Sequence, residues 1–367
     1  WASAKLRCSC GNSRRLSTAL NPAQRGWIKC AKQEPTLSSA LVRQSLSEPL
    51  PRIHQSYLYD ARGIELYEKI LEQSEYYLPA AEDWLLLTRL DDIAQGARAS
   101  RRSEAIIELG AGDGQRTLHL IERIAEISSD PIVYAPADIS SDALQSNEAH
   151  FNASGLGRHH RCVPIQGVHE EAIAAAGAAF GADRSLTFLF MGSSLGNLDD
   201  DEIVALFHCV HGQLSGAHRV ASHPGRFLVG VDLPHSDRKP AARVWRAYND
   251  EAGWTAAFTL NALSHVNTVA GTDFQPSAWR HVADYDEDKK AIVTHVEAIS
   301  PQLLTVPSDG GGGRRELRRF ASGERIFMEQ SRKFGQPVIQ SLAQAAGMHL
   351  ARSWSSDDYL ICELTVR

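Results

Sequence analysis

The sequence contains little of what marks membrane or nucleic-acid-binding proteins. Its 38 lysine and arginine residues are outnumbered by 44 aspartate and glutamate residues, and the net charge is -6. Nucleic-acid-binding domains usually present a basic face, so this balance argues against such a partner. No apolar run approaches the roughly 20 residues that span a bilayer, and the longest run, residues 186–191, has the length of one strand. We expect a soluble, cytoplasmic monomer with neither a membrane nor a nucleic-acid partner.

Cysteine is also sparse, with six residues at positions 8, 10, 30, 162, 209 and 362. This scattered spacing indicates reduced, mostly buried thiols rather than a disulfide framework. Cys8, Cys10 and Cys30 lack a fourth ligand at a spacing that would suit zinc. The sequence therefore predicts no metal site.

Acidic residues are absent from residues 1–33, which carry seven lysines and arginines and several serines. Such a composition is typical of an organelle transit peptide, and it fits a disordered extension equally well. We predict that residues 1–46 form a basic extension outside the folded domains. Organelle targeting by residues 1–33 stays open as an alternative.

From Tyr57 onwards, apolar residues recur with the periods of helices and strands. Continuous apolar runs, typical of strands covered on both faces, alternate with amphipathic stretches, typical of helices. The predicted elements are, in order, helices at 66–71 and 80–93, a strand at 105–107, a helix at 117–127, a strand at 132–134, a helix at 141–151, and strands at 186–191 and 226–232. This alternation predicts a parallel, doubly wound sheet.

After Pro234 the alternation stops. The further predicted elements are helices within 241–265, a strand at 291–296, a glycine-rich loop at 308–315 with a return strand at 325–328, a helix at 337–346 and a strand at 359–366. The last two resemble the closing elements of the first sheet. We therefore predict an α/β protein in which a second, smaller α+β domain (residues 47–80 and 241–332) is inserted before the sheet domain (residues 81–240 and 333–367) is completed.

A glycine-rich turn, Glu108-x-Gly110-x-Gly112-x-Gly114, follows a predicted buried strand and precedes a predicted helix. Glycines permit positive φ and close approach of a ligand to the backbone, and a helix N-terminus offers free N–H groups. The dinucleotide fingerprint is G-x-G-x-x-G, whereas the third glycine here comes one residue earlier. The spacing resembles that of methyltransferases that bind S-adenosylmethionine, and Asp138 is placed to accept both ribose hydroxyls. A structural glycine turn in another α/β enzyme is the alternative.

Further motifs occur in the order seen in one family, and the resemblance that they carry covers roughly residues 55–367. They are Tyr59-Asp60-x-x-Gly63, Leu66-Tyr67-Glu68-x-Ile70, Glu75-Tyr76-Tyr77, Met191-Gly192-Ser193-Ser194-Leu195-Gly196-Asn197-Leu198, Val229-Gly230-Val231-Asp232-Leu233, Ala247-Tyr248-Asn249-Asp250, Thr255-Ala256-Ala257-Phe258-x-Leu260-Asn261, Phe320-Ala321-Ser322-Gly323-Glu324 and Glu329-x-Ser331-x-Lys333-Phe334. Together they resemble the histidine-specific N-alpha-methyltransferases of ergothioneine biosynthesis. The resemblance implies a Rossmann-like methyltransferase sheet with S-adenosylmethionine as cofactor.

The resemblance also implies the substrate and the residues that hold it. Members of the family bind free L-histidine between two domains and methylate its α-amine up to three times, which gives the betaine hercynine. By this resemblance Asn197 and Tyr248 hold the carboxylate, since an amide and a phenol can both donate to it. Glu329 and Ser331 hold the imidazole, the acid accepting a ring N–H and the hydroxyl satisfying the other nitrogen. Without the resemblance, Asn197 would be read as a turn residue.

Further positions are carried over in the same way. Tyr76 lines the substrate pocket, Thr294 lies where the family has an apolar pocket residue, and Tyr59 lies by the amine and could relay its proton in catalysis. The positions matched to cofactor binding are Glu108, Gly110, Gly112, Gly114, Arg116, Asp138, Val168 and His169.

One departure from the family pattern and the range of substrates in the family leave alternatives open. Val168 stands where the family usually has an acid that meets the adenine amino group, which leaves adenine recognition to backbone groups or to His169. Related members act on prenylated tryptophan, so tryptophan or another amino acid is a second possible substrate. A non-catalytic relative that only binds the cofactor is a third possibility. Retention of Glu329 and Ser331, which suit a polar ring, favours histidine.

Overall fold

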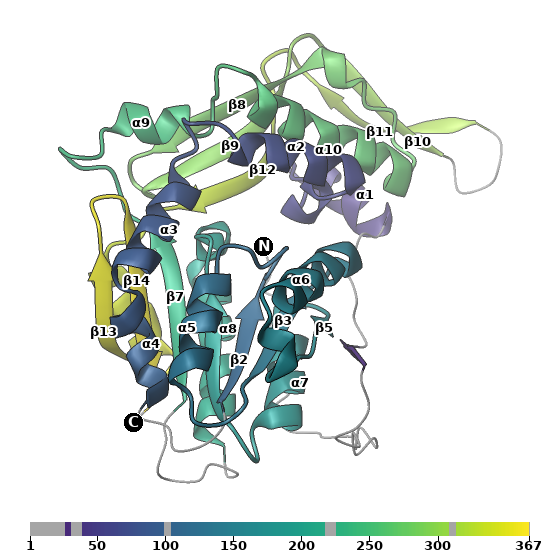
Figure 1. Ribbon diagram of the computed structural model, residues 1–367. Helices are drawn as coiled ribbons and strands as arrows, with labels where there is room; N and C mark the ends of the chain where they lie inside the picture. The colour runs from purple at the N-terminus through teal and green to yellow at the C-terminus, as the bar shows by residue number, and fades with distance from the viewer. Residues whose placement is uncertain (1–25, 31–38, 99–103, 217–224, 308–312, 367) are drawn as a thin grey trace. The chain divides into compact units, whose positions relative to one another are not determined.

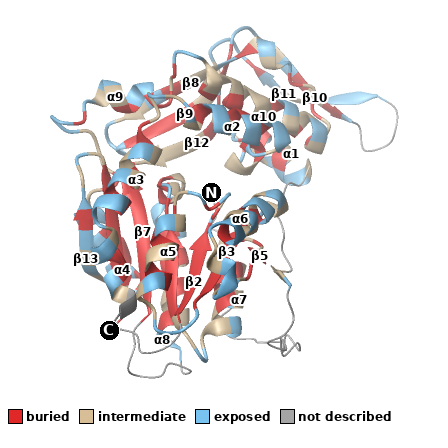
Figure 2. Ribbon diagram, viewed as in Figure 1, coloured by how far each residue is buried: buried red, intermediate tan, exposed pale blue. Residues whose placement is uncertain are grey.

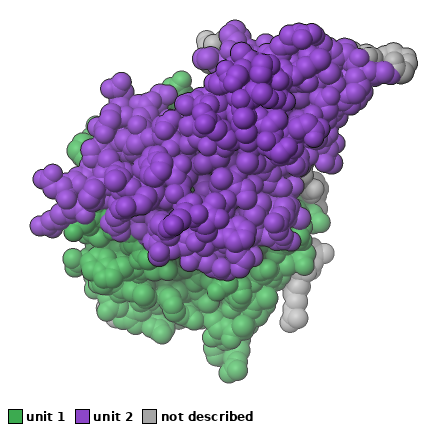
Figure 3. Space-filling model, turned by 90° about the horizontal axis from the view of Figure 1, so that it is seen from above, with its two compact units in different colours: residues 1–34, 80–233, 334–367 green, residues 35–79, 234–333 purple. Residues whose placement is uncertain are grey.

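The computed structural model describes residues 26–30, 39–98, 104–216, 225–307 and 313–366 (Figure 1). The chain forms two compact units (Figure 3). The first unit comprises residues 1–34, 80–233 and 334–367, and the second comprises residues 35–79 and 234–333. The chain therefore enters the second unit twice and returns to the first unit to complete its sheet.

The first unit is built on a nine-stranded, mostly parallel sheet. Its strands are β1 (Ile28–Lys29), β2 (Glu104–Leu109), β3 (Val133–Asp138), β4 (Arg161–Cys162), β5 (Ile165–Gln166), β6 (Ser185–Phe190), β7 (Arg226–Asp232), β13 (His349–Ser355) and β14 (Tyr359–Thr365). The order is β1-β5-β3-β2-β6-β7-β14-β13, with β4 beside β3. Neighbouring strands are parallel up to β7, and β14 and β13 are antiparallel to their neighbours.

Helices cover both faces of this sheet. They are α3 (Leu78–Thr88), α4 (Leu90–Arg98), α5 (Leu118–Ile127), α6 (Ser141–Ala153), α7 (His169–Phe180), α8 (Asp200–Ser215) and α11 (Gln336–Ala345), with short 3-10 turns η2 (Leu156–Arg158) and η3 (Ser194–Asn197). Alternate residues of a strand face opposite sides, so Phe227 and Val229 of β7 join the core with α7, α8 and α11, whereas Leu228 joins the core with α3, α4, α5 and α6. Every residue of β2 and β7 is buried (Figure 2). The predicted doubly wound α/β sheet is confirmed in this mixed, mostly parallel form.

The second unit has a smaller antiparallel architecture. Its elements are α1 (Ser39–Ser47), η1 (Gln55–Leu58), α2 (Ala61–Leu71), α9 (Ala241–Arg246), α10 (Trp254–Ala270), η4 (Pro276–Ala278), β8 (Trp279–Asp286), β9 (Ala291–Ala298), β10 (Gln302–Pro307), β11 (Arg314–Phe320) and β12 (Arg325–Arg332). Three strands pair in the order β12-β9-β8, and β10 and β11 form a separate hairpin. Phe258 and Leu263 of α10 share a core with Val296 of β9 and Ile326 of β12.

Asp60, from the motif Tyr59-Asp60-x-x-Gly63, joins two helices of this unit. Asp60 caps the N-terminus of α2, where its Oδ1 accepts a hydrogen bond from the backbone N–H of Gly63 (2.7 Å). The same oxygen accepts a hydrogen bond from Nδ2 of Asn261 in α10 (2.7 Å). A Cβ on Gly63 would lie 1.8 Å from the carbonyl oxygen of Leu58, so this position excludes any side chain. The motif therefore fixes how α2 meets α10.

The prediction of the strand that returns after the glycine-rich loop is wrong. The prediction paired this loop with a return strand at 325–328, but the strand that returns is β11, which pairs with β10. Residues 325–328 belong to β12, which pairs with β9. The sequence of β11, Arg-Arg-Glu-Leu-Arg-Arg-Phe, lacks the apolar alternation from which strands are predicted. Residues 308–312 of the loop lie outside the described residues.

The predicted N-terminal extension, residues 1–46, is wrong over its last residues. Ser39–Ser47 form helix α1, in which Val42 and Leu46 are buried in the core of the second unit. The guanidinium of Arg43 donates to the carbonyl of Ala270 (3.1 Å). Earlier in the chain, β1 pairs in parallel with β5. Cys8, Cys10 and the rest of residues 1–25 and 31–38 lie outside the described residues. Among the described helices, none is both long and apolar enough to cross a membrane.

Candidate functional site

The residues predicted to bind the cofactor gather where the parallel strands of the first unit end. The carboxyl ends of β5, β3, β2 and β6 lie at one edge of the sheet, where open α/β sheets usually bind their ligands. The glycine turn follows β2, Asp138 ends β3, and Val168 and His169 follow β5. Asn197 is the last residue of the turn η3 after β6. Chain segments distant in sequence thus meet at this edge.

The glycine turn adopts a backbone that favours glycine. Gly110, Gly112 and Gly114 have φ values of 64°, 53° and 71°, which residues with a side chain rarely adopt. A Cβ on Gly114 would lie 2.3 Å from Nδ2 of Asn147. That amide donates to the carbonyl oxygen of Gly112 (3.3 Å) and to the hydroxyl of Tyr134 (3.2 Å). Asn147 therefore holds the turn in a conformation that favours glycine, and at Gly114 it leaves no room for a side chain.

Asp138 is an oriented acceptor beside this turn. Its Oδ2 accepts a hydrogen bond from the backbone N–H of Gly112 (3.1 Å), and its Oδ1 accepts one from the N–H of Ser140 (2.9 Å). A carboxylate oxygen can accept two hydrogen bonds, so each oxygen keeps room for one more donor. This geometry fits a ligand with two adjacent hydroxyls, such as a ribose.

Glu108 faces the interior below the turn. Its Oε2 accepts hydrogen bonds from Oγ1 of Thr117 (2.9 Å) and from the hydroxyl of Tyr134. Burial raises the pKa of Glu108 to about 7, although the two hydrogen bonds lower it. The carboxyl joins β2, β3 and α5, so its contacts support the turn.

His169 lies next to the turn, close to Gly110. It is the first residue of α7, after the N-cap residue Val168. A Cβ on Gly110 would lie 3.7 Å from its Nε2, and its ring packs edge-on against Phe190 with centroids 5.1 Å apart. Burial lowers the pKa of His169, although the charges of Glu170 and Asp138 raise it. A neutral imidazole can both donate and accept a hydrogen bond, which suits the edge of an adenine.

Glu82 is a buried acid at this edge that the sequence analysis missed. Its Oε1 accepts a hydrogen bond from the N–H of Gly192 (3.0 Å), in the loop between β6 and η3. Burial raises the pKa of Glu82, while the Gly192 hydrogen bond and the charge of Arg116 lower it. The next loop residue, Ser193, has φ of 57° and donates its N–H to the hydroxyl of Tyr359 (3.1 Å). Glu82 thus fixes the loop that leads to Asn197, and no motif in α3 marks it.

In the second unit, the predicted ring-binding residues share one sheet face. Glu329 lies directly opposite Thr294, and Ser331 lies opposite Ile292. Opposite residues of paired strands project to the same side of a sheet. Thr294 is buried at 2% exposure. Glu329, Ser331 and Thr294 therefore form one polar patch on the pair β9-β12.

A hydroxyl array lies at the end of this patch. The hydroxyl oxygens of Tyr248 and Ser331 are 2.7 Å apart. Nζ of Lys333, which follows β12, donates to Tyr248 (2.7 Å) and to Ser331 (2.9 Å). The ammonium also lies 4.6 Å from the centroid of the Tyr248 ring, and Lys333 is 3% exposed. Burial raises the pKa of Glu329 to about 7, and the charge of Lys333 lowers it.

Aromatic rings continue the patch. The rings of Tyr76 and Tyr248 meet edge-on with centroids 6.1 Å apart. Tyr59 meets Tyr67 at 5.8 Å and Phe258 at 5.3 Å, also edge-on. Burial raises the pKa of Tyr76 well above its usual value, and Tyr67, Tyr248 and Tyr59 raise it further. Tyr59 is 40% exposed, so it joins the cluster to solvent. Tyr67, which received no role in the sequence analysis, is part of this cluster.

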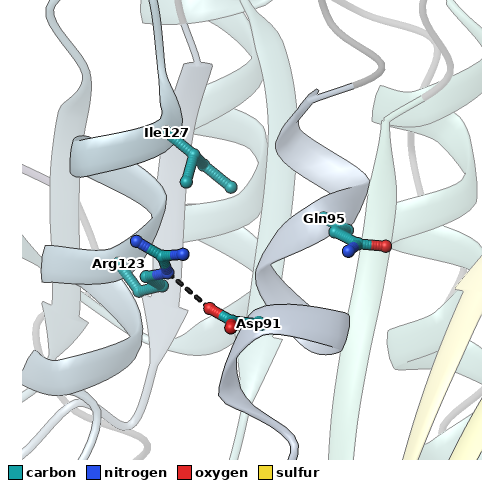
Figure 4. A pocket seen from close by; sticks show the side chains of 4 residues that line it. All are labelled: Asp91, Gln95, Arg123 and Ile127. Carbon is teal, nitrogen blue, oxygen red and sulfur yellow. Dashed lines mark hydrogen bonds and ion pairs between the residues drawn. The ribbon is translucent and has the colours of Figure 1, made fainter.

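A small pocket of the first unit lies elsewhere. It is lined by Asp91, Gln95, Arg123 and Ile127 of α4 and α5 (Figure 4). Nε of Arg123 donates to Oδ1 of Asp91 (2.6 Å). The lining residues of α5 belong to its C-terminal half, whereas the glycine turn precedes its N-terminus. The pocket is therefore separate from the turn. Across the described ranges, no three His, Cys, Asp or Glu residues group so as to hold a metal ion.

Known proteins resemble this chain over most of its length. The model of a family described as "Histidine-specific methyltransferase, SAM-dependent" matches residues 38–367. The histidine N-alpha-methyltransferase of Mycolicibacterium smegmatis is 30% identical over 86% of this chain and 89% of that protein. The one of Mycobacterium tuberculosis is 29% identical over 82% and 85%. The N-methyltransferase imqF of Aspergillus flavus is 24% identical over 82% of this chain and 77% of that protein. The relatives thus include two proteins named for histidine and one named only for N-methylation.

Proposed function

Since the chain belongs to the family of histidine-specific, S-adenosylmethionine-dependent methyltransferases, we propose that its methyl acceptor is the α-amino nitrogen of L-histidine. Three transfers give the trimethyl betaine hercynine, in the first step of ergothioneine biosynthesis. The observation that carries this function is the polar patch of Glu329, Ser331 and Thr294 on one face of the second unit. Its polar groups suit a ring with two nitrogens.

Histidine fits the patch better than tryptophan does. Glu329 pairs with one ring nitrogen and Ser331 with the other. An indole has a single N–H, so it would leave one of these groups without a partner. Leaving a buried polar group unpaired costs about 1–3 kcal/mol, more if the group is charged. Sites of this kind reject ligands that lack the matching group.

The remaining contacts position the amino-acid backbone of the substrate. Tyr248 and Asn197 donate hydrogen bonds to its carboxylate. Tyr76, which packs against Tyr248, lines the same part of the pocket.

The first unit holds the methyl donor. The contacts of Asp138 fit ribose hydroxyls, and the glycine turn offers backbone without Cβ atoms. His169 or the backbone near Val168 meets the adenine, and Arg116 lies near the start of α5. S-adenosylmethionine supplies the electrophilic methyl group of its sulfonium. The residues of the chain accelerate transfer by holding the amine in line with that methyl group.

The aromatic cluster contacts the amine of the substrate and takes part in its deprotonation. The nitrogen must lose a proton before each transfer, and Tyr59, which is partly exposed, passes that proton to water. Each transfer makes the nitrogen more substituted, and the last leaves a permanent cation. The faces of Tyr59, Tyr67 and Phe258 can accommodate such a cation by cation–π attraction.

Incubation with labelled S-adenosylmethionine and a panel of free amino acids tests this function. We expect histidine to be methylated in preference to the others, with mono-, di- and trimethylated products in mass spectra. If tryptophan is methylated in preference, the proposed substrate histidine is wrong and tryptophan, the second possible substrate, takes its place. Calorimetry with S-adenosylhomocysteine and histidine identifies a non-catalytic relative, which would bind both and transfer nothing, or a decayed one, which would bind neither.

A further inference from the structure

Lys333 is a buried cation to which the proposed function gives no task. It is 3% exposed, and its ammonium donates to the hydroxyls of both Tyr248 and Ser331. Burying an ammonium is costly unless it is hydrogen-bonded or paired. Lys333 directly follows β12, and its bond to Ser331 places the ammonium on the face that Ser331 shares with Glu329. A residue that contacts both hydroxyls can influence the ligand contacts that each of them makes.

We propose that Lys333 is a positioning residue that holds Tyr248 and Ser331 as one hydrogen-bond array, and thereby couples recognition of the substrate carboxylate to recognition of its ring. This inference rests on the proposed function, which assigns the carboxylate to Tyr248 and the ring to Ser331. Lys333 acts through these two hydroxyls and needs no contact with the substrate.

A count of hydrogens explains the coupling. An ammonium can only donate, whereas each hydroxyl has one hydrogen to give. The contact of 2.7 Å between Tyr248 and Ser331 uses one of their two hydrogens. The other hydrogen points away from the pair. The hydroxyl that carries it can donate to a group outside the pair, whereas the second hydroxyl can only accept from such a group. Without Lys333 the two hydroxyls could separate, and each could donate on its own.

The order of donation follows from the substrate. A carboxylate can only accept, so Tyr248 gives it the outward hydrogen, and Ser331 accepts from a ring N–H. Glu329 meets the other ring nitrogen. With a pKa of about 7, its carboxyl accepts from that nitrogen when ionised and donates to it when protonated. The array therefore specifies a donor at the carboxylate and an acceptor at the ring.

Lys333→Met tests the coupling, because methionine keeps the length of the side chain and removes its donors. Three ligands are compared in the presence of S-adenosylhomocysteine: L-histidine, L-histidinol, which lacks the carboxylate, and L-phenylalanine, which lacks ring nitrogens. We expect histidine to bind at least about tenfold more weakly, since a charged donor is lost. Both preferences, over histidinol and over phenylalanine, should shrink together. Lys289→Met, which changes an exposed lysine in the β8-β9 turn, should change neither the affinity for histidine nor the two preferences.

The outcomes separate this inference from the proposed function. If the wild-type protein does not bind histidine, the proposed function fails. If it does, and a folded Lys333→Met protein keeps both preferences or loses only one, the coupling by Lys333 fails alone. A merely structural lysine would weaken all three ligands by the same factor, and this result would also overturn the coupling.

A second measurement applies even if Lys333→Met does not fold. Tyr248→Phe, Ser331→Ala and the double variant are compared for histidine affinity. Members of one hydrogen-bond array give non-additive losses, so the double variant should lose clearly less than the product of the two single losses. Losses that multiply would mean that the hydroxyls act independently, which contradicts the array.

Discussion

The glycine turn of the first unit and the polar patch of the second unit are built in opposite ways. The turn consists of backbone whose φ values only glycine adopts readily, and its neighbours Asp138 and Asn147 bind that backbone. The patch consists of side chains that project from paired strands, with Lys333 bonded to hydroxyls from two segments. Backbone sites tolerate little change in shape, whereas side-chain sites can be altered one group at a time. We therefore expect changes in the patch to alter which substrate binds, and changes near the turn to alter how tightly the cofactor binds.

Two acids with raised pKa values sharpen this contrast. Burial raises the pKa of both Glu108 and Glu329 to about 7. Glu108 accepts hydrogen bonds from Thr117 and Tyr134 of its own unit, so its contacts serve the fold. Glu329 lies in the patch near Lys333, whose charge lowers its pKa. The same perturbation thus accompanies a supporting role in one unit and a proposed ligand contact in the other.

The largest effect is expected from Glu329→Ala. Loss of a charged partner costs about 1.5–3 kcal/mol, so the Michaelis constant for histidine should rise by about 10-fold to 150-fold. Affinity for S-adenosylhomocysteine should stay the same, because Glu329 is not proposed to contact the cofactor. Steady-state kinetics and calorimetry measure the two quantities. Glu287→Ala, at an exposed acid of the same unit, is the control.

A large apolar residue at the same position extends this test. Glu329→Leu should improve turnover of tryptophan or phenylalanine relative to histidine in a competition assay. Unchanged selectivity in both variants would contradict the assignment of the ring to this patch.

Asp138→Ala should weaken cofactor binding by about tenfold, because the ribose hydroxyls lose a charged acceptor. The Michaelis constant for histidine, measured at saturating cofactor, should change little. Calorimetric titration with S-adenosylhomocysteine is the measurement, and Asp142→Ala, an exposed acid at the start of α6, is the control. An unchanged dissociation constant in folded Asp138→Ala protein would show that the ribose binds elsewhere.

Glu108→Gln should remove a pH dependence of stability. The pKa of Glu108 is about 7 in the folded protein against 4.5 ordinarily, so between these values the folded state keeps a proton that the unfolded state has lost. Stability of the wild-type protein therefore falls as the pH rises through this window, by about 1 kcal/mol per pH unit from this group. Glutamine does not titrate, so the variant should gain on the wild type from pH 5 to 7. Urea unfolding at several pH values measures the difference, to which Glu329 contributes equally in both proteins. A constant difference would contradict the raised pKa.

Asn147→Ala should have the smallest effect. Its amide supports the carbonyl of Gly112 but is not proposed to contact the ligand. A neutral hydrogen bond contributes about 0.5–1.5 kcal/mol, so cofactor affinity should fall severalfold, less than for Asp138→Ala. The same calorimetric titration applies, with exposed Asn152→Ala as control. A loss larger than that of Asp138→Ala would mean that Asn147 itself holds the cofactor.

Local sequence patterns predicted the first unit well. The buried runs of β2, β6 and β7 and the spacing of the glycine turn are consecutive in the chain, so their periodicity and glycine content indicate the structure directly. The predictions failed where local pattern is weak. The arginine-rich strand β11 shows no apolar alternation, and α1 lies in a stretch that its basic neighbours made look like an extension.

The sequence by itself determined the doubly wound sheet, the glycine turn and, through its motifs, membership in the methyltransferase family. These depend on neighbouring residues, whose period and backbone preferences are written in the chain order. Only the tertiary structure decided that Lys333 bonds to Tyr248 and Ser331, that Thr294 faces Glu329, and that Glu82 supports the loop before Asn197. Such contacts join residues far apart in the chain. They arise from strand register and from packing in the folded core, which no local pattern specifies.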